Sequence, residues 1–163
     1  KNFGFAGETS VIAPGINAKM NEMQSALGLL QLEYFSYNIS KRQAVAEKYL
    51  KMLSGIPGLR MPDYKTVVDY NYAYFPVLIE KENFGISRDK LYDNFKGLNI
   101  YTRRYFFPLI SNFSTYKSLD SAKPENLPNA NRIAENVICL PVYADMNDSD
   151  QQRIIDVIKD SMN

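Results

Sequence analysis

Apolar positions recur with helical spacing after an N-terminal arm that lacks such spacing. Residues 1–19 contain several glycines and prolines and no helical periodicity, which predicts an extended or looping arm. In the residues that follow, apolar side chains recur three and four positions apart, and the pair Asn21 and Gln24 is typical of a capping box. The periodicity weakens around Asn38 and then returns until Ser54. We therefore expect one long helix that begins near Asn21 and is bent or broken near Asn38.

A unit of strand, helix and strand is predicted in the middle of the chain. Residues 72–79 are rich in aromatic and β-branched side chains, which favours a strand, and Pro76 within it favours an edge position or a bulge. Residues 100–107 should form a neighbouring strand. Between the two, Ser87 can cap a helix whose apolar face consists of Leu91, Phe95 and Leu98.

Two more helices are expected towards the C-terminus. Pro128 suits the first turn of one of them, whose inward-facing residues would be Ala130, Ile133 and Val137. Asn147 or Asp148 can cap the other, whose apolar residues are Ile154, Ile155, Ile158 and Met162. The predicted fold is α+β, with a small antiparallel or mixed sheet covered by helices. In this interpretation residues 1–20 are an arm, and residues 21–163 are a C-terminal domain that includes the long helix.

Composition and charge exclude several classes of function. With 45% hydrophobic residues the chain can bury a core, and 19 Lys and Arg against 18 Asp and Glu give a net charge of +1. Phosphate-dominated binding of nucleic acids usually requires a basic excess, so a nucleic-acid partner is disfavoured. No apolar run approaches the roughly 18 residues of a membrane span. Because the chain has no histidine, it cannot by itself hold a Ser-His or Cys-His pair or a His-ligated zinc ion.

The single cysteine, Cys139, lies between apolar neighbours and is expected to be a buried thiol. It has no partner for an internal disulfide, so a reducing compartment and a cytoplasmic location are the simpler interpretation. The chain starts at Lys1 and continues into the glycine-rich residues 3–7, which are typical of a loop entered midway. We expect it to be a fragment of a longer protein.

Residues 15–32 form the most informative segment. A polar turn that contains Asn17 and Lys19 precedes a helix, and Gly28 within that helix suggests close approach of a backbone or a ligand. One interpretation is a core helix with small packing residues. The other is an anion site, because an amide and an ammonium group ahead of a helix N-terminus suit a negatively charged ligand.

The segment Arg103-Arg104-Tyr105 combines two guanidinium groups with aromatic rings, which suits a ligand that contains a diphosphate and a base. On a strand, Arg103 and Tyr105 would point one way and Arg104 the other, so one arginine at most should face a site. The alternative is an edge strand with surface arginines and core aromatic residues. Nucleic-acid binding through the two arginines would be strongly salt-dependent and conflicts with the near-zero net charge.

These segments together resemble the DegT/DnrJ/EryC1/StrS family of sugar aminotransferases. The Gly-x-Asn-x-Lys-Met turn and the helix after it, residues 15–32, carry the main motif, and residues 1–4, 103–109 and 140–143 support it. The resemblance implies an aspartate aminotransferase-like fold, pyridoxal 5′-phosphate (PLP) as cofactor, and a homodimer whose sites are shared between subunits. It also implies that the chain is the C-terminal small domain of such an enzyme.

The resemblance assigns roles to individual residues. Asn17 would reach the neighbouring subunit and hydrogen-bond the PLP phosphate, and Lys19 would face a cofactor or nucleotide phosphate unless it is a solvated lysine. The Schiff-base lysine of the family precedes the Gly-x-Asn turn by a long interval, so Lys1 is no candidate and the catalytic lysine is expected to be absent from this chain. Arg103, Arg104 and Tyr105 would contact the substrate.

The implied activity is transfer of an amino group from L-glutamate to a keto nucleotide-sugar, in surface polysaccharide, including lipopolysaccharide, or deoxyaminosugar biosynthesis. Many relatives have histidine where this chain has Ile110, and residues 103–111 resemble those family members that aminate a dTDP-4-keto-6-deoxyhexose. The alternative is a non-catalytic PLP-binding or dimerisation module of the same fold.

Overall fold

The computed structural model describes residues 3–64 and 69–162 of the chain. Within it the chain divides into two compact units, Lys1–Tyr37 and Asn38–Asn163, which are described separately below. Among the described residues, no helix is long and apolar enough to cross a membrane.

The first unit consists of a folded-back arm and a helix. In the arm, Ile12 N donates to Gly4 O over 2.9 Å and Phe3 N to Ile16 O over 3.1 Å, so its two halves run side by side. Helix α1, Glu22–Glu33, follows. The Asn21 side chain accepts from Gln24 N at 2.9 Å and the Gln24 side chain accepts from Asn21 N at 3.2 Å, which confirms the predicted capping box.

The long helix is broken, but at Tyr34 and not near Asn38. Helix α2, Phe35–Met52, begins one residue after Tyr34, whose backbone conformation departs from the helical one. The apolar pattern weakens around Asn38 because most of the first turns of α2 are exposed, and exposure does not interrupt the hydrogen bonds of a helix. The predicted position of the helix break near Asn38 is therefore wrong, because the weak apolar pattern reflects exposure.

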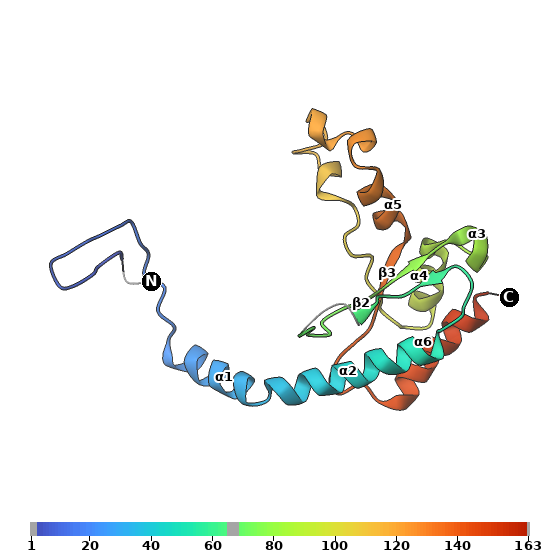
Figure 1. Cartoon of the computed structure of the whole chain (residues 1–163), viewed down its shortest axis with the longest axis horizontal. Helices are drawn as coiled ribbons and strands as arrows, with labels where there is room; N and C mark the ends of the chain where they lie inside the picture. Colours follow the sequence, from blue (N-terminus) through green and yellow to red (C-terminus); the bar gives the residue numbers. More distant parts are fainter. Residues whose placement is uncertain (1–2, 65–68, 163) are drawn as a thin grey trace. The chain divides into compact units, whose positions relative to one another are not determined.

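The second unit is built on a three-stranded antiparallel sheet in the order β1-β2-β3, formed by Leu59–Arg60, Phe75–Ile79 and Val137–Leu140 (Figure 1). Strand β2 is central, so the edge position predicted for Pro76 is wrong. Proline is tolerated there because β1 pairs only with Leu78 and Ile79, which leaves Pro76 without a partner on that side.

The partner of β2 also differs from the prediction. Residues 100–107 do not form a strand, and only Arg103 makes an isolated bridge, to Cys139 of β3. Val137, expected on a helix, is instead the first residue of β3, because helix α5, Pro128–Asn136, ends one residue earlier. The run Val137–Leu140 is short and wholly apolar, a pattern that fits a buried strand and a buried helical turn equally well.

Helices surround this sheet. Helix α3 is Lys81–Phe84, α4 is Arg88–Gly97 and α6 is Asp148–Asp160, and three short 3₁₀ helices, Ile110–Asn112, Asp120–Ala122 and Pro124–Asn126, precede α5. Ser87 caps α4 by accepting from Lys90 N at 3.2 Å, and Asn147 caps α6 by accepting from Asp150 N at 2.7 Å. Both predicted caps and the first-turn position of Pro128 are confirmed.

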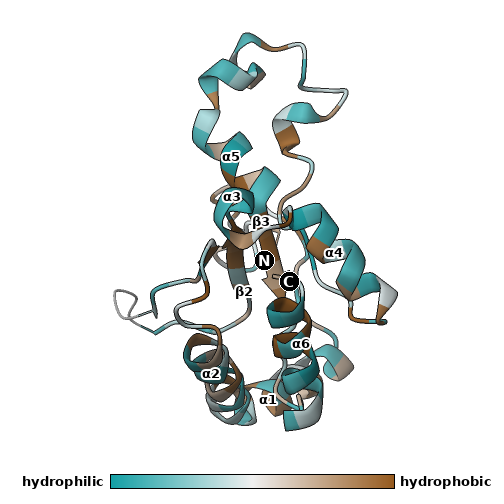
Figure 2. Ribbon diagram, turned by 90° about the vertical axis from the view of Figure 1, so that its right-hand side faces the viewer, coloured by the Kyte–Doolittle hydropathy of each residue, from teal (hydrophilic) through white to brown (hydrophobic). Residues whose placement is uncertain are grey.

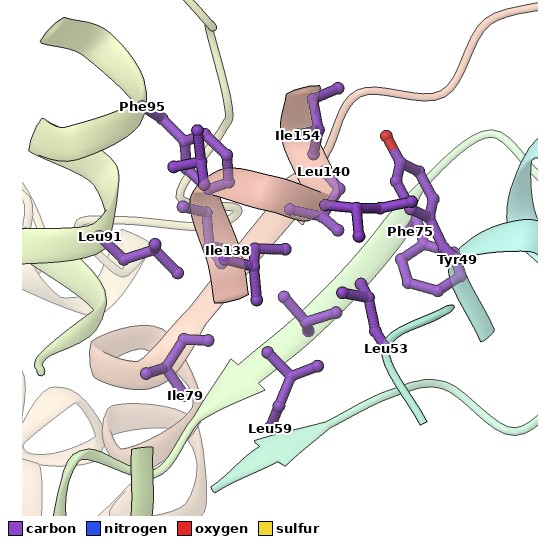
Figure 3. Close-up of a cluster of buried hydrophobic side chains, with 14 of the residues drawn as sticks. Tyr49, Leu53, Leu59, Phe75, Ile79, Leu91, Phe95, Ile138, Leu140 and Ile154 are labelled. Carbon is purple, nitrogen blue, oxygen red and sulfur yellow. The ribbon is translucent and has the colours of Figure 1, made fainter. Parts of the chain in front are cut away.

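The core lies where β2 and β3 meet α2, α4 and α6. Phe75, Val77 and Ile79 of β2 are fully buried, and Figure 3 shows Tyr49 of α2 beside Phe75 and the α4 side chains close to Ile138. Figure 2 shows the strands as the hydrophobic centre, with hydrophilic residues along the outer sides of α4 and α6. Leu98 is the exception to the predicted apolar face, because it is 51% exposed after the end of α4.

Polar contacts link α2 to α6 at the border of this core. The buried Gln151 side chain donates to Val45 O over 2.7 Å, and Lys48 pairs with Asp148 at 2.7 Å. Tyr49 donates to Pro141 O over 3.1 Å, and burial raises the pKa of this phenol. The described residues confirm an α+β fold with a small antiparallel sheet covered by helices.

Candidate functional site

Asn17 is exposed in the arm, four residues before the cap of α1. In the backbone before Asn17, two glycines lie where neighbouring backbone atoms approach closely. A side chain at Gly4 would collide with the carbonyl group of Ala13, and one at Gly15 would collide with the backbone of Gly4. Gly4 also has a φ of +85°, which favours glycine. These glycines allow the two halves of the arm to approach closely just before Asn17.

Lys19 lies between Asn17 and the start of α1, and its ammonium nitrogen is 6.0 Å from the centroid of the Phe3 ring. An amide donor and an ammonium group therefore occur within three residues, ahead of a capped helix N-terminus. This donor set fits a phosphate group, because both side chains donate hydrogen bonds and a helix N-terminus favours anions.

Arg104 is held against α4 by an ion pair and by aromatic rings. Its Nη1 lies 2.9 Å from Asp89 Oδ1, and its guanidinium carbon is 4.4 Å from the Tyr92 ring centroid and 5.0 Å from that of Phe107. Partial burial opposes ionisation of Asp89. The hydrogen bonds and charges of Arg104 and Arg88 outweigh this effect and hold the pKa of the carboxyl below its ordinary value.

Arg88, which the sequence did not single out, is the second partner of Asp89. The side chain is 2% exposed, its Nε donates to Asp89 Oδ1 over 2.8 Å, and its Nη1 donates to Ala134 O over 2.9 Å and to Val137 O over 2.7 Å. Burial lowers the pKa of Arg88, while Asp89 opposes that shift. Arg88 thereby joins the start of α4 to the junction of α5 and β3.

Arg103 and Tyr105 have different surroundings from Arg104. The Arg103 backbone pairs with Cys139, and its exposed guanidinium forms no hydrogen bond or ion pair with any described residue. The Tyr105 ring centroid lies 4.9 Å from that of Tyr74, whose hydroxyl donates to the Tyr105 hydroxyl over 3.3 Å. This hydrogen bond raises the pKa of Tyr74, and the positive charge of Arg103 opposes the rise.

The predicted site residues fall into two groups. Asn17 and Lys19 belong to the first unit, and Arg103, Arg104 and Tyr105 belong to the second. Within residues 3–64 and 69–162 there is no group of three or more His, Cys, Asp or Glu that could hold a metal ion. The prediction of a buried thiol is confirmed, and burial raises the pKa of Cys139 to about 11.

Two features of this region were not predicted as part of a site. Tyr74 was predicted only as part of the strand over residues 72–79, although Tyr70, Tyr72 and Tyr74 alternate just before β2, a spacing that could have indicated a shared face. No sequence pattern indicated that Arg88 pairs with Asp89 in a buried site, because adjacent opposite charges at a helix start are common on solvated surfaces.

Comparison with known proteins gives consistent results. The model of the DegT/DnrJ/EryC1/StrS aminotransferase family matches residues 1–159. A dTDP-4-amino-4,6-dideoxy-D-glucose transaminase of Escherichia coli is 47% identical over 148 residues, which are 91% of this chain and 40% of that protein. A protein of the same name from Shigella dysenteriae is 36% identical over 160 residues, 98% of this chain and 43% of the other.

A solved structure, that of DesI, is also similar to this chain. The crystal structure of DesI in the presence of its TDP-sugar product superposes with a TM-score of 0.84 at 30% identity, over 99% of this chain and 40% of DesI. The chain thus spans about two fifths of the length of the relatives that it matches. Because the family model covers nearly all of its residues, the chain belongs to the DegT/DnrJ/EryC1/StrS aminotransferase family.

Proposed function

We propose that the protein to which this chain contributes transfers an amino group from L-glutamate to the keto carbon of a dTDP-4-keto-6-deoxyhexose, with PLP as cofactor. The observation that carries this proposal is the 47% identity to the Escherichia coli dTDP-4-amino-4,6-dideoxy-D-glucose transaminase over 91% of the chain. The second relative, at 36% identity, has the same name and supports the same substrate class. The product would serve the synthesis of surface polysaccharides, including lipopolysaccharide, or of other deoxyaminosugars.

In this proposal Asn17 and Lys19 hold the phosphate end of the cofactor. The Asn17 amide donates a charge-assisted hydrogen bond to a phosphate oxygen, and Lys19 supplies a positive charge close to it. The close approach at Gly4 and Gly15 restrains the backbone before the turn, so the amide is positioned before the ligand arrives. When bound, PLP supplies the electron sink that amino transfer requires.

The second group of residues receives the nucleotide sugar. Arg103 presents a guanidinium group without an ion-pair partner among the described residues, which suits a diphosphate. Arg104, in contrast, is bound to Asp89 and packed between Tyr92 and Phe107, so we assign it the role of positioning this segment. Arg103 is therefore assigned to substrate binding and Arg104 to positioning, a choice that the sequence did not decide.

The assembly follows from these roles. We propose a cytoplasmic homodimer in which residues 1–20 are an arm of the preceding large domain and residues 21–163 are the small domain with its linking helix. Asn17 would serve the site of the partner subunit. The Schiff-base lysine belongs to residues outside this chain, so the isolated chain should form no amino sugar.

The test is an assay of the full-length protein with PLP, L-glutamate and a dTDP-4-keto-6-deoxyhexose. Formation of 2-oxoglutarate that depends on the keto sugar is expected. Failure to form it with several dTDP- and UDP-linked keto sugars would overturn the proposal. Binding of PLP without turnover, with no lysine upstream of the Gly-x-Asn turn, would instead support a non-catalytic module.

A further inference from the structure

Three aromatic rings, those of Tyr74, Tyr105 and Phe106, form a stack of tilted ring contacts, and the exposed Arg103 precedes Tyr105 by two residues. The Tyr105 ring contacts Tyr74 on one side, with centroids 4.9 Å apart and planes inclined by 30°, and Phe106 on another, with centroids 4.2 Å apart and planes inclined by 38°. The Tyr105 ring therefore already contacts two other aromatic rings. The outer rings remain accessible, since Tyr74 is 44% exposed and Phe106 is 62% exposed.

The two outer rings have different surroundings. Phe106 lines an apolar pocket together with Leu109 and with Ala130 and Ile133 of α5, where no charged side chain contributes to the lining. Tyr74 contacts Tyr105, which follows the exposed Arg103 by two residues, and the positive charge of Arg103 acts on the Tyr74 hydroxyl. A ligand that combines a flat ring with a strong negative charge is therefore matched by the Tyr74 end of the stack.

Tyr74 is also held in place by its neighbours. The hydroxyl groups of Tyr64 and Tyr70 both donate to the carbonyl oxygen of Tyr74, over 3.1 Å and 3.3 Å. Because the Tyr74 hydroxyl donates to that of Tyr105, the hydrogen of the Tyr105 hydroxyl is left to donate to a ligand oxygen. The Tyr74 ring and its hydroxyl partner are thus held in place before any ligand binds, which lowers the entropic cost of binding.

We infer that Tyr74 is a nucleotide-binding residue. Its partly exposed ring stacks on the base of a nucleoside diphosphate group, while Arg103 binds the diphosphate and the Tyr105 hydroxyl donates to one of its oxygens. The inference rests on the proposed function, because a nucleotide-linked substrate is what brings a base and a diphosphate to this surface. It moves the stacking role from Tyr105, predicted from sequence, to Tyr74.

The test measures binding of thymidine diphosphate, thymidine and pyrophosphate to the full-length, PLP-loaded protein by calorimetry. Tyr74→Ala should weaken thymidine and thymidine diphosphate about tenfold and leave pyrophosphate unchanged. Arg103→Ala should weaken thymidine diphosphate and pyrophosphate but not thymidine. Tyr74→Phe, which keeps the ring, should retain most of the affinity for thymidine. Tyr116→Ala removes another tyrosine that is 44% exposed and should change none of the three affinities.

The outcomes separate this inference from the proposed function. Thymidine diphosphate affinity within twofold of wild type in Tyr74→Ala, or an equal loss for pyrophosphate, would overturn the role of Tyr74 even if the enzyme turns over. The expected pattern in a protein that forms no 2-oxoglutarate would support the nucleotide site and contradict the proposed reaction. The kcat/KM for L-glutamate should not change in Tyr74→Ala, because this parameter reports only the glutamate half of the transfer and Tyr74 is assigned to the nucleotide.

Discussion

Arg88 is buried where three parts of the chain meet, and its side chain donates to a carboxylate and two main-chain carbonyls. Replacement by alanine would leave the carbonyls of Ala134 and Val137 without these donors and would leave a cavity beside Phe107. We expect Arg88→Ala to lower the free energy of unfolding by about 3 kcal/mol, because two buried carbonyls lose their donors and a buried side chain is removed. Hydrogen exchange of the β3 amides in the full-length protein measures this change.

Arg60→Ala is the matched control for Arg88. Its ion pair with Glu80, at 3.2 Å, is largely exposed, so its removal should cost no more than about 0.5 kcal/mol. Equal effects of the two substitutions would show that the buried network around Arg88 does not stabilise the junction of α5 and β3.

Cys139 should react slowly in the folded protein. Burial raises the pKa of its thiol to about 11, so at pH 8 the thiolate fraction is about 100-fold below that of a free cysteine. Alkylation of the Cys139 peptide, followed by mass spectrometry, should be slower by at least this factor until the protein is unfolded. A cysteine introduced at the exposed Ser54 should react rapidly, and comparable rates at both positions would contradict the burial of Cys139.

The raised pKa of Cys139 also makes the free energy of unfolding depend on pH. The folded-state pKa of Cys139 lies above the unfolded value of 9.0, so above pH 9 the folded state binds more protons than the unfolded state. The contribution of this group to stability is therefore complete below pH 9 and declines as the pH rises towards 11. Cys139→Ala should reduce this alkaline loss, which urea unfolding at pH 8 and pH 10.5 compares.

At the scale of elements, α6 depends on its cap and its apolar face. The Asn147 side chain accepts from Asp150 N, and Ile154, Ile155 and Ile158 bury one side of the helix in the core. Asn147→Ala should lower the free energy of unfolding by about 1 kcal/mol, whereas Asn147→Ser keeps an oxygen acceptor and should cost much less. Faster hydrogen exchange in the first turn of α6 would accompany the alanine variant. Equal stability of the two variants would contradict the capping role.

The elements that sequence predicted correctly have local signals. Capping residues at Asn21, Ser87 and Asn147 fix helix starts, because each satisfies backbone groups a few residues away. The pairing of β2 with β3 depends on residues about 60 positions apart, so it leaves no local signal. The sequence therefore indicated the helices better than the sheet, and it assigned to residues 100–107 the place that Val137–Leu140 occupies.

At the scale of the whole molecule, the two groups of site residues were predictable to different extents. The turn around Asn17 has a long and specific motif, so the resemblance alone could assign its role. Arg103 and Arg104 are adjacent and chemically identical, and only their contacts distinguish them: Arg104 is paired with Asp89 and Arg103 is exposed. Tyr74 lies 31 residues from Tyr105, and their contact could not be predicted without the fold.

The role of Asn17 can be measured independently of turnover. Loss of its charge-assisted hydrogen bond should weaken PLP binding to the full-length protein by about 10- to 100-fold in Asn17→Ala. Asn17→Asp, which has the same shape but a negative charge, should weaken it further. Asn21→Ser keeps the cap of α1 and should leave PLP affinity unchanged. Titration followed by cofactor absorbance measures these values, and unaltered affinity in Asn17→Ala would remove the residue from the cofactor site.

The most direct test of the central claim follows the amino nitrogen itself. Full-length protein is incubated with PLP, ¹⁵N-labelled L-glutamate and dTDP-4-keto-6-deoxyglucose, and the nucleotide sugar is analysed by mass spectrometry. We predict a dTDP-linked amino sugar that carries the label. A keto sugar that remains unchanged, or an amino sugar without the label in the presence of labelled glutamate alone, would contradict the assignment of this chain to a glutamate-dependent nucleotide-sugar aminotransferase.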